Sequence, residues 1–244
     1  MKRNIIGFFS GVAYGVATAI PGISGGSVLV ICGSYETVCK ALSLDIKTIK
    51  ENLFFLAVFA AGAAAGLVGL AHAIAYLLLH FQFATYMAIA VLICAGLPSV
   101  MKTGFKDRPV SPICLIPALL GYAAVITIFI FESLGLSGVG GEINLFALIA
   151  CSAMAGITAI IPGVSGAFVL MVFGIYETTV AAVVNLDFGV IIPIGIGMLA
   201  GLIGGSRLIT ALLKRARQYV YSAIIGMIIG SALMLVISSL AQYG

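Results

Sequence analysis

Two copies of a short motif carry the residue types in this chain that could bind an anion. Each copy reads Pro-Gly-x-Ser-Gly, beginning at Pro21 and at Pro162. Proline removes a helical hydrogen-bond donor and glycine lets the backbone turn, so each motif predicts a helix break followed by a new helix start. The first N–H groups of a helix lack partners within it and attract negative charge. The break itself is formed by Pro21, Gly22, Pro162 and Gly163, and the residues expected to bind an anionic substrate are Ser24, Gly25, Gly26, Ser27, Ser165 and Gly166.

A simpler interpretation of the two motifs is that Ser24 and Ser165 only cap their helices and that the glycines only allow close packing. The duplication favours a binding site over this interpretation. Arg207 is a further candidate because it is the one cation inside an apolar run. Its guanidinium could hold a phosphate through two parallel hydrogen bonds, or it could extend toward the nearby membrane surface.

Two glutamates follow the motifs and are candidates for coupling. Glu36 and Glu177 lie about eleven residues beyond the breaks, which predicts a position near the membrane interfaces. They could carry a coupling proton, pair with Arg207 or a loop lysine, or simply be solvated. The neighbouring Tyr35 and Tyr176 are typical of interfacial aromatic residues.

The composition predicts an all-α membrane protein with a single domain over residues 1–244. Hydrophobic residues make up 62% of the chain and charged residues 8%, against about 25% charged residues in soluble domains. The few basic residues are scattered, which excludes nucleic-acid binding. The five cysteines form no C-x-x-C pair, so we expect neither a metal nor a cofactor. The sequence leaves open whether copies form a homo-oligomer.

An internal duplication organises the chain. Residues 15–37 align with residues 156–178 without a gap, and 12 of the 23 positions are identical. Further along, residues 65–69 match residues 200–204, and Tyr86 falls opposite Tyr221. The sequence therefore predicts repeat 1 over residues 5–101, a linker span over 112–133 and repeat 2 over 144–240.

The apolar runs predict five spans, since crossing a bilayer takes about 20 residues. They cover residues 53–79, 84–101, 112–133, 189–213 and 218–240. The motif regions, residues 5–42 and 144–184, are broken near the middle, and their first halves are too short to cross. We therefore expect each to be a re-entrant hairpin that returns to its own side of the membrane.

The positive-inside rule favours this topology with a cytoplasmic N-terminus. It places eleven of the twelve Lys and Arg residues inside, namely Lys2, Arg3, Lys40, Lys47, Lys50, Lys102, Lys106, Arg108, Lys214, Arg215 and Arg217. Each repeat then begins and ends on one face, and the linker span inverts the second copy relative to the first. Inverted repeats with broken helices that meet near the midplane are typical of alternating-access transporters.

The motif pair, each copy followed by Gly-x-Tyr-Glu, resembles the PopT family of polyprenyl-phosphate transporters over residues 5–240. The resemblance implies a bacterial inner-membrane protein that returns undecaprenyl phosphate to the cytoplasmic leaflet, with lipids as its partners and the two motifs as its substrate site. Ser27 stands where threonine is common in that family, and the hydroxyl is retained.

Two other functions compete with lipid transport. A lipid phosphatase would need a nucleophile and a base, yet Gly26 and Ala167 follow the Ser-Gly pairs where such enzymes have histidine. We therefore predict that the chain is not an enzyme. A secondary transporter or channel for a small soluble anion would share the same site and symmetry, so it stays open as the alternative.

Overall fold

The structure is a computed structural model and describes residues 2–19, 24–69, 71–106, 110–133 and 144–241. Within these ranges the chain is helical, with short connecting turns and no strand. The helices are α1 (Lys2–Ala19), α2 (Gly25–Ile31), α3 (Tyr35–Leu42), α4 (Ile46–Gly69), α5 (Ala71–His80), α6 (Gln82–Phe105), the 3₁₀ turn η1 (Pro112–Cys114), α7 (Leu115–Ser133), α8 (Leu145–Ile160), α9 (Gly166–Val172), α10 (Tyr176–Asn185) and α11 (Phe188–Ala241).

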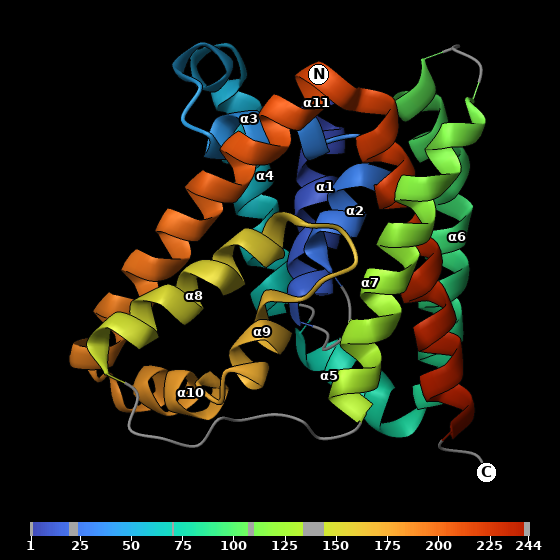
Figure 1. The fold of residues 1–244 in the computed structure, drawn as a ribbon. Helices are drawn as coiled ribbons and strands as arrows, with labels where there is room; N and C mark the ends of the chain where they lie inside the picture. Colours follow the sequence, from blue (N-terminus) through green and yellow to red (C-terminus); the bar gives the residue numbers. More distant parts are fainter. Residues whose placement is uncertain (1, 20–23, 70, 107–109, 134–143, 242–244) are drawn as a thin grey trace.

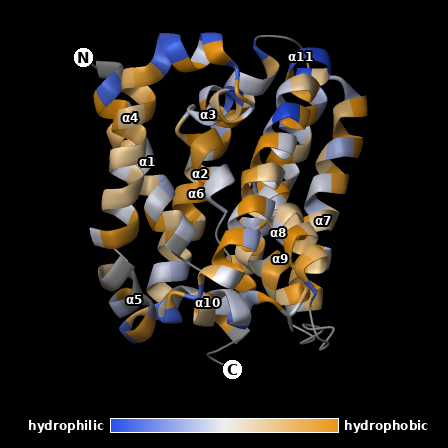
Figure 2. Cartoon of the chain, turned by 90° about the vertical axis from the view of Figure 1, so that its left-hand side faces the viewer, coloured by the Kyte–Doolittle hydropathy of each residue, from blue (hydrophilic) through white to orange (hydrophobic). Residues whose placement is uncertain are grey.

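Among the described residues, four helices are long and apolar enough to cross a membrane: α4, α6, α7 with η1, and α11. This agrees with the predicted multi-pass membrane protein. α1 packs along α4, α8 packs along the first part of α11, and α7 covers the end of α11 (Figure 1). Both views place α3 at the end of the bundle where the N-terminus lies and α10 at the other end (Figures 1 and 2).

The two copies of the motif have the same local backbone. α2 and α9 begin directly after Ser24 and Ser165, whose φ and ψ angles are −89° and 122° in the first case and −91° and 128° in the second. Gly33 and Gly174, just after these helices, have φ angles of 69° and 68°, a region that favours glycine. The duplication read from the sequence is therefore repeated in the conformation of the chain.

One predicted span boundary is wrong, because the span predicted over 53–79 is divided between α4 and α5. The spans predicted over 189–213 and 218–240 correspond to the two arms of α11, which meet at a kink. α11 bends sharply at Ala216, where φ is −139° and ψ is 41°. Phe81, 135 positions earlier and just before α6, has nearly the same angles, −135° and 42°. Residues 206–225 contain no proline or glycine, so the sequence signal for this bend is the basic break between two apolar runs, at Lys214, Arg215 and Arg217.

Glycines spaced four apart, as at Gly62 and Gly66 and at Gly197 and Gly201, are typical of close helix crossings, and the structure has such crossings at both pairs. A Cβ atom at Gly62 or Gly66 of α4 would overlap a backbone carbonyl oxygen of α1. At Gly197 or Gly201 of α11 it would overlap a carbonyl oxygen of α8. Small residues at such crossings let helix backbones approach closely within a bilayer.

We expect Gly201→Leu to destabilise the protein strongly, because the side chain would collide with the backbone of Ala153 and push α8 away. Overpacking costs about 1–3 kcal/mol even where side chains can adjust, and a backbone atom adjusts less. Gly204→Leu is the matched control, since a Cβ atom there meets nothing within 4 Å. Thermal unfolding in detergent should separate the two variants. Equal melting temperatures would contradict this account of the crossing.

Candidate functional site

The two motif turns meet, although they lie 141 residues apart in the sequence. The Ser24 hydroxyl donates to the carbonyl oxygen of Ile161 over 3.1 Å. In return, the N–H of Gly163 donates to the Ser27 hydroxyl over 2.9 Å. The predicted meeting of the two turns is confirmed by these reciprocal hydrogen bonds.

A close backbone approach accompanies these bonds. A Cβ atom at Gly26 would lie 2.8 Å from the carbonyl oxygen of Ile160 and 3.1 Å from the nitrogen of Pro162. The last carbonyls of α8 therefore face the first turn of α2, an arrangement in which the partial charges of the two helix ends attract. Gly26 and Ser27 are buried at this contact, whereas Gly25 is buried against Tyr14 and Thr18 of α1. The first turn of α2 therefore joins the two repeats.

The second turn is left more open. Ser165 and Gly166 are half-buried and Ala167 is exposed, whereas Pro162 is fully buried. Neither Ser24 nor Ser165 caps its helix through its side chain. The two serines occupy the N-cap positions without the capping hydrogen bond that the simpler interpretation assigns to their side chains, whereas the close approaches at Gly26 and Gly166 agree with its packing role for the glycines. Two predicted site residues, Pro21 and Gly22, lie outside the described residues.

Arg207 does not join the two turns in the structure. It lies on α11 with an exposed side chain, and its Nε donates to the carbonyl oxygen of Ser43 over 3.3 Å, just beyond α3. Its predicted contact with an anion at the turns therefore has no geometric support in the described part of the chain.

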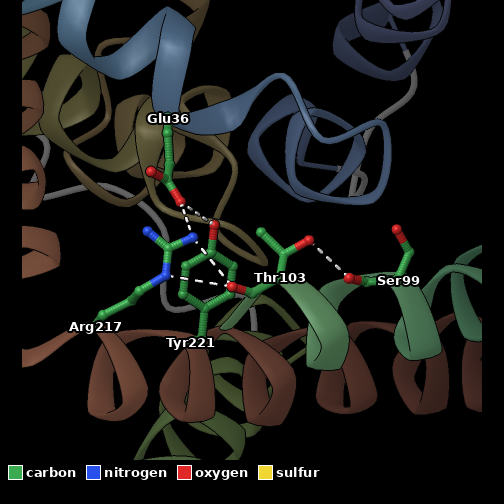
Figure 3. A network of polar contacts seen from close by, with 5 residues as sticks. All are labelled: Glu36, Ser99, Thr103, Arg217 and Tyr221. Carbon is green, nitrogen blue, oxygen red and sulfur yellow. Dashed lines mark hydrogen bonds and ion pairs between the residues drawn. The ribbon is translucent and has the colours of Figure 1, made fainter. Parts of the chain in front are cut away.

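A polar network joins α3, α6 and α11 (Figure 3). Glu36 of α3 forms an ion pair with Arg217 of α11, and the Tyr221 hydroxyl donates to the same carboxylate oxygen over 2.8 Å. Nε and one terminal nitrogen of Arg217 donate to the carbonyl oxygen of Thr103 on α6, over 3.3 and 3.0 Å. The Arg217 guanidinium also lies 5.1 Å from the centre of the Tyr221 ring.

This network corrects two predictions. Glu36 pairs with Arg217 and not with Arg207 or a loop lysine. Tyr35, predicted at the interface, is instead 1% exposed within the core, because α3 is held against α11.

The network also sets the charge of Glu36, which lies outside the four long apolar helices. Burial alone would raise the pKa of this carboxyl, but hydrogen bonds from Arg217 and Tyr221 and the charge of Arg217 hold its pKa below the usual value. Glu36 is therefore a carboxylate at neutral pH in this structure, which does not favour a proton-carrying role in this state. Glu177, the second coupling candidate, is exposed on α10.

The sequence does not single out Arg217, which is one of eleven basic residues on the predicted cytoplasmic side. The repeat alignment does contain a signal, since Tyr221 matches Tyr86 and the same offset pairs Arg217 with a neutral residue, Gln82. The two copies therefore differ in charge at this position.

Comparison with known proteins gives consistent matches over nearly the whole chain. A family model described as undecaprenyl phosphate translocase-like matches residues 1–109 and 92–241. A polyprenyl-phosphate transporter of Staphylococcus aureus is 28% identical over 238 residues, covering 93% of this chain and 84% of that protein. A polyprenyl-phosphate transporter of Vibrio cholerae serotype O1 is 25% identical over 239 residues, covering 92% of this chain and 75% of that protein. No solved structure matches significantly.

Proposed function

Because the chain belongs to the undecaprenyl phosphate translocase-like family, we propose that it carries a polyprenyl phosphate, undecaprenyl phosphate in particular, across the bacterial cytoplasmic membrane. Its relatives are named polyprenyl-phosphate transporters, and its long apolar helices suit a multi-pass membrane protein. The direction that we propose returns the lipid carrier to the cytoplasmic leaflet for reuse in cell-wall synthesis.

We propose that the α3 end of the bundle faces the cytoplasm and that the two repeats are inverted. The strongest hydrophilic colouring lies at this end, beside the N-terminus (Figure 2). The opposite positions of α3 and α10 support inversion, since these helices occupy equivalent places in the two repeats. We also propose a re-entrant path for both motif regions, which the short lengths of α1 and α8, 18 and 16 residues, support.

The phosphate, in this proposal, is held where the two motif turns meet. In the present structure the accessible donors are at the second turn, where Ser165 and Gly166 are half-buried and uncapped by side chains. In the opposite state of the cycle the pseudo-symmetric Ser24 and Gly25 would take their place. Each state then offers hydroxyl and N–H donors to the phosphate without a buried cation.

The observation that carries this proposal is the direct contact between the turns, made by the bonds from Ser24 to Ile161 and from Gly163 to Ser27. Transporters built from inverted repeats bind their substrates at the repeat interface, on broken helices. In this proposal, the phosphate of the substrate is passed from one repeat to the other at the contact between the two motif turns.

Binding to the purified protein tests the proposed substrate. We expect undecaprenyl phosphate to raise the thermal stability in detergent, because a ligand that binds only the folded state stabilises it. Undecaprenol, which lacks the phosphate, should not do so. Inorganic phosphate should neither stabilise the protein nor compete at millimolar concentration. Stabilisation by inorganic phosphate alone would instead favour the small-anion transporter, and no effect of the lipid phosphate would contradict the proposal.

A further inference from the structure

The two hairpins have the same local backbone but are packed differently. On α3, Tyr35 and Cys39 are each 1% exposed. Their counterparts on α10, 141 positions later, are Tyr176, which is half-buried, and Val180, which is 46% exposed. α3 packs against α11, whereas α10 makes at most marginal contact with α6, the helix in the equivalent place. α3 is therefore packed more closely against its neighbouring helices than α10 is.

The polar residues that hold α3 against α11 have counterparts near α10 that cannot form the same ion pair. Glu36 of α3 is joined to Arg217 and Tyr221, and the repeat alignment pairs these three with Glu177, Gln82 and Tyr86. Glutamine carries no charge, so Gln82 cannot neutralise Glu177 as Arg217 neutralises Glu36. Glu177 is exposed on α10, and among the described residues no ion pair joins α10 to α6.

We infer that Glu36, Arg217 and Tyr221 form a lock that holds the α3 end of the transport path shut, while the α10 end, which lacks such a lock, is the open end in this structure. The inference rests on the proposed function, since it treats the structure as one end state of an alternating-access cycle. Transport then requires the ion pair to break so that α3 can leave α11.

The carbonyl of Thr103 makes the lock a junction of three helices. Arg217 donates to it from α11 while binding Glu36 of α3, so α6 is tied to the same point (Figure 3). Thr103 Oγ1 in turn donates to the carbonyl of Ser99 within α6 over 2.9 Å. If α3 moved away from α11, Arg217 would keep its carbonyl partner but lose its carboxylate partner. The free energy cost of losing the carboxylate keeps the closed state populated.

Thiol labelling measures which end is open, independently of lipid transport. Cys39 and Val180 are counterparts, so Cys39 reports on the α3 end and a thiol introduced by Val180→Cys reports on the α10 end. The other four cysteines, Cys32, Cys94, Cys114 and Cys151, are replaced by alanine. With a water-soluble maleimide and the purified full chain, we expect Cys39 to react at least about tenfold more slowly than the thiol introduced at position 180, because a minor open state is typically populated at about 0.1–10%.

Four variants test how the lock sets the balance between the two ends. Arg217→Gln and Glu36→Gln should speed labelling of Cys39 and slow labelling at position 180, because the two ends open alternately. Arg217→Lys keeps the charge but loses the fork that reaches both Glu36 and the Thr103 carbonyl, so its labelling rates should lie between those of the parent and of Arg217→Gln. Gln82→Arg gives Glu177 a partner, so it should slow labelling at position 180 and speed it at Cys39.

Unchanged labelling of Cys39 in Arg217→Gln would overturn the lock. Faster labelling of Cys39 with no change at position 180 would also overturn it, because the ion pair would then be only a local packing contact. The labelling assay contains no lipid, so it tests the lock alone. The binding measurement with undecaprenyl phosphate, described above, tests the proposed substrate separately.

Discussion

Replacing Gly26 with valine is expected to abolish transport of the lipid phosphate in a protein that still folds. A Cβ atom at this position meets the carbonyl oxygen of Ile160 at 2.8 Å and the nitrogen of Pro162 at 3.1 Å. Both are backbone atoms of the second turn and cannot rotate away. A branched side chain must therefore push the two turns apart and break the bonds that Ser24 and Ser27 make across the contact.

The stability of the Gly26→Val variant should fall only moderately, by about 1–3 kcal/mol as for other overpacked sites, because the contacts between the long helices do not involve this residue. Gly69→Val is the matched control, since a Cβ atom at Gly69 meets nothing within 4 Å. Reconstituted transport should be lost in the first variant and kept in the second. Normal transport by the Gly26 variant would mean that the meeting of the turns is not needed.

Ser165→Leu is expected to remove binding of undecaprenyl phosphate. The variant loses a hydroxyl donor that is half-buried and not used in capping, and its larger side chain would occupy the place of the phosphate. A hydrogen bond to a charged group is worth about 1.5–3 kcal/mol, which corresponds to a loss of affinity of roughly 10- to 150-fold before any steric effect.

Two further variants test whether the effect of Ser165→Leu is specific. Ser165→Thr keeps the hydroxyl and should bind nearly as well as the parent. Thr178→Leu makes a similar change from a hydroxyl to an apolar side chain at an exposed position of α10, and should leave binding intact. Titration of the lipid phosphate by thermal shift gives the comparison. Full affinity in Ser165→Leu would exclude this turn as the phosphate site.

Local features of this chain were predictable because they depend on residue type and repetition. The duplicated Pro-Gly-x-Ser-Gly motif predicts two broken helices, and Ser24 and Ser165 take equivalent backbone angles. Glycines spaced four apart predict close crossings, as at Gly66 and Gly201. The contact between the turns also followed from the repeat, once the two copies were expected to enter from opposite faces.

Long-range features were harder to predict. The bend at Ala216 lies in the predicted break between two spans, but without proline or glycine its sharp angle could not be predicted. The pairing of Glu36 with Arg217 joins residues 181 positions apart, and positions in a sequence do not tell which of several basic residues a carboxylate reaches. The difference in packing between α3 and α10 could not be predicted from the two motif copies, because both helices begin with the same Tyr-Glu-Thr sequence.

The most direct measurement for the whole account is the leaflet distribution of undecaprenyl phosphate in liposomes that contain the purified protein. The lipid is supplied in one leaflet, and its phosphate is followed by a probe that cannot cross the bilayer. We expect the protein to move the lipid to the other leaflet far faster than protein-free liposomes do, and Gly26→Val to behave like the protein-free sample. Equal rates with and without the protein, while binding is intact, would contradict transport by this chain.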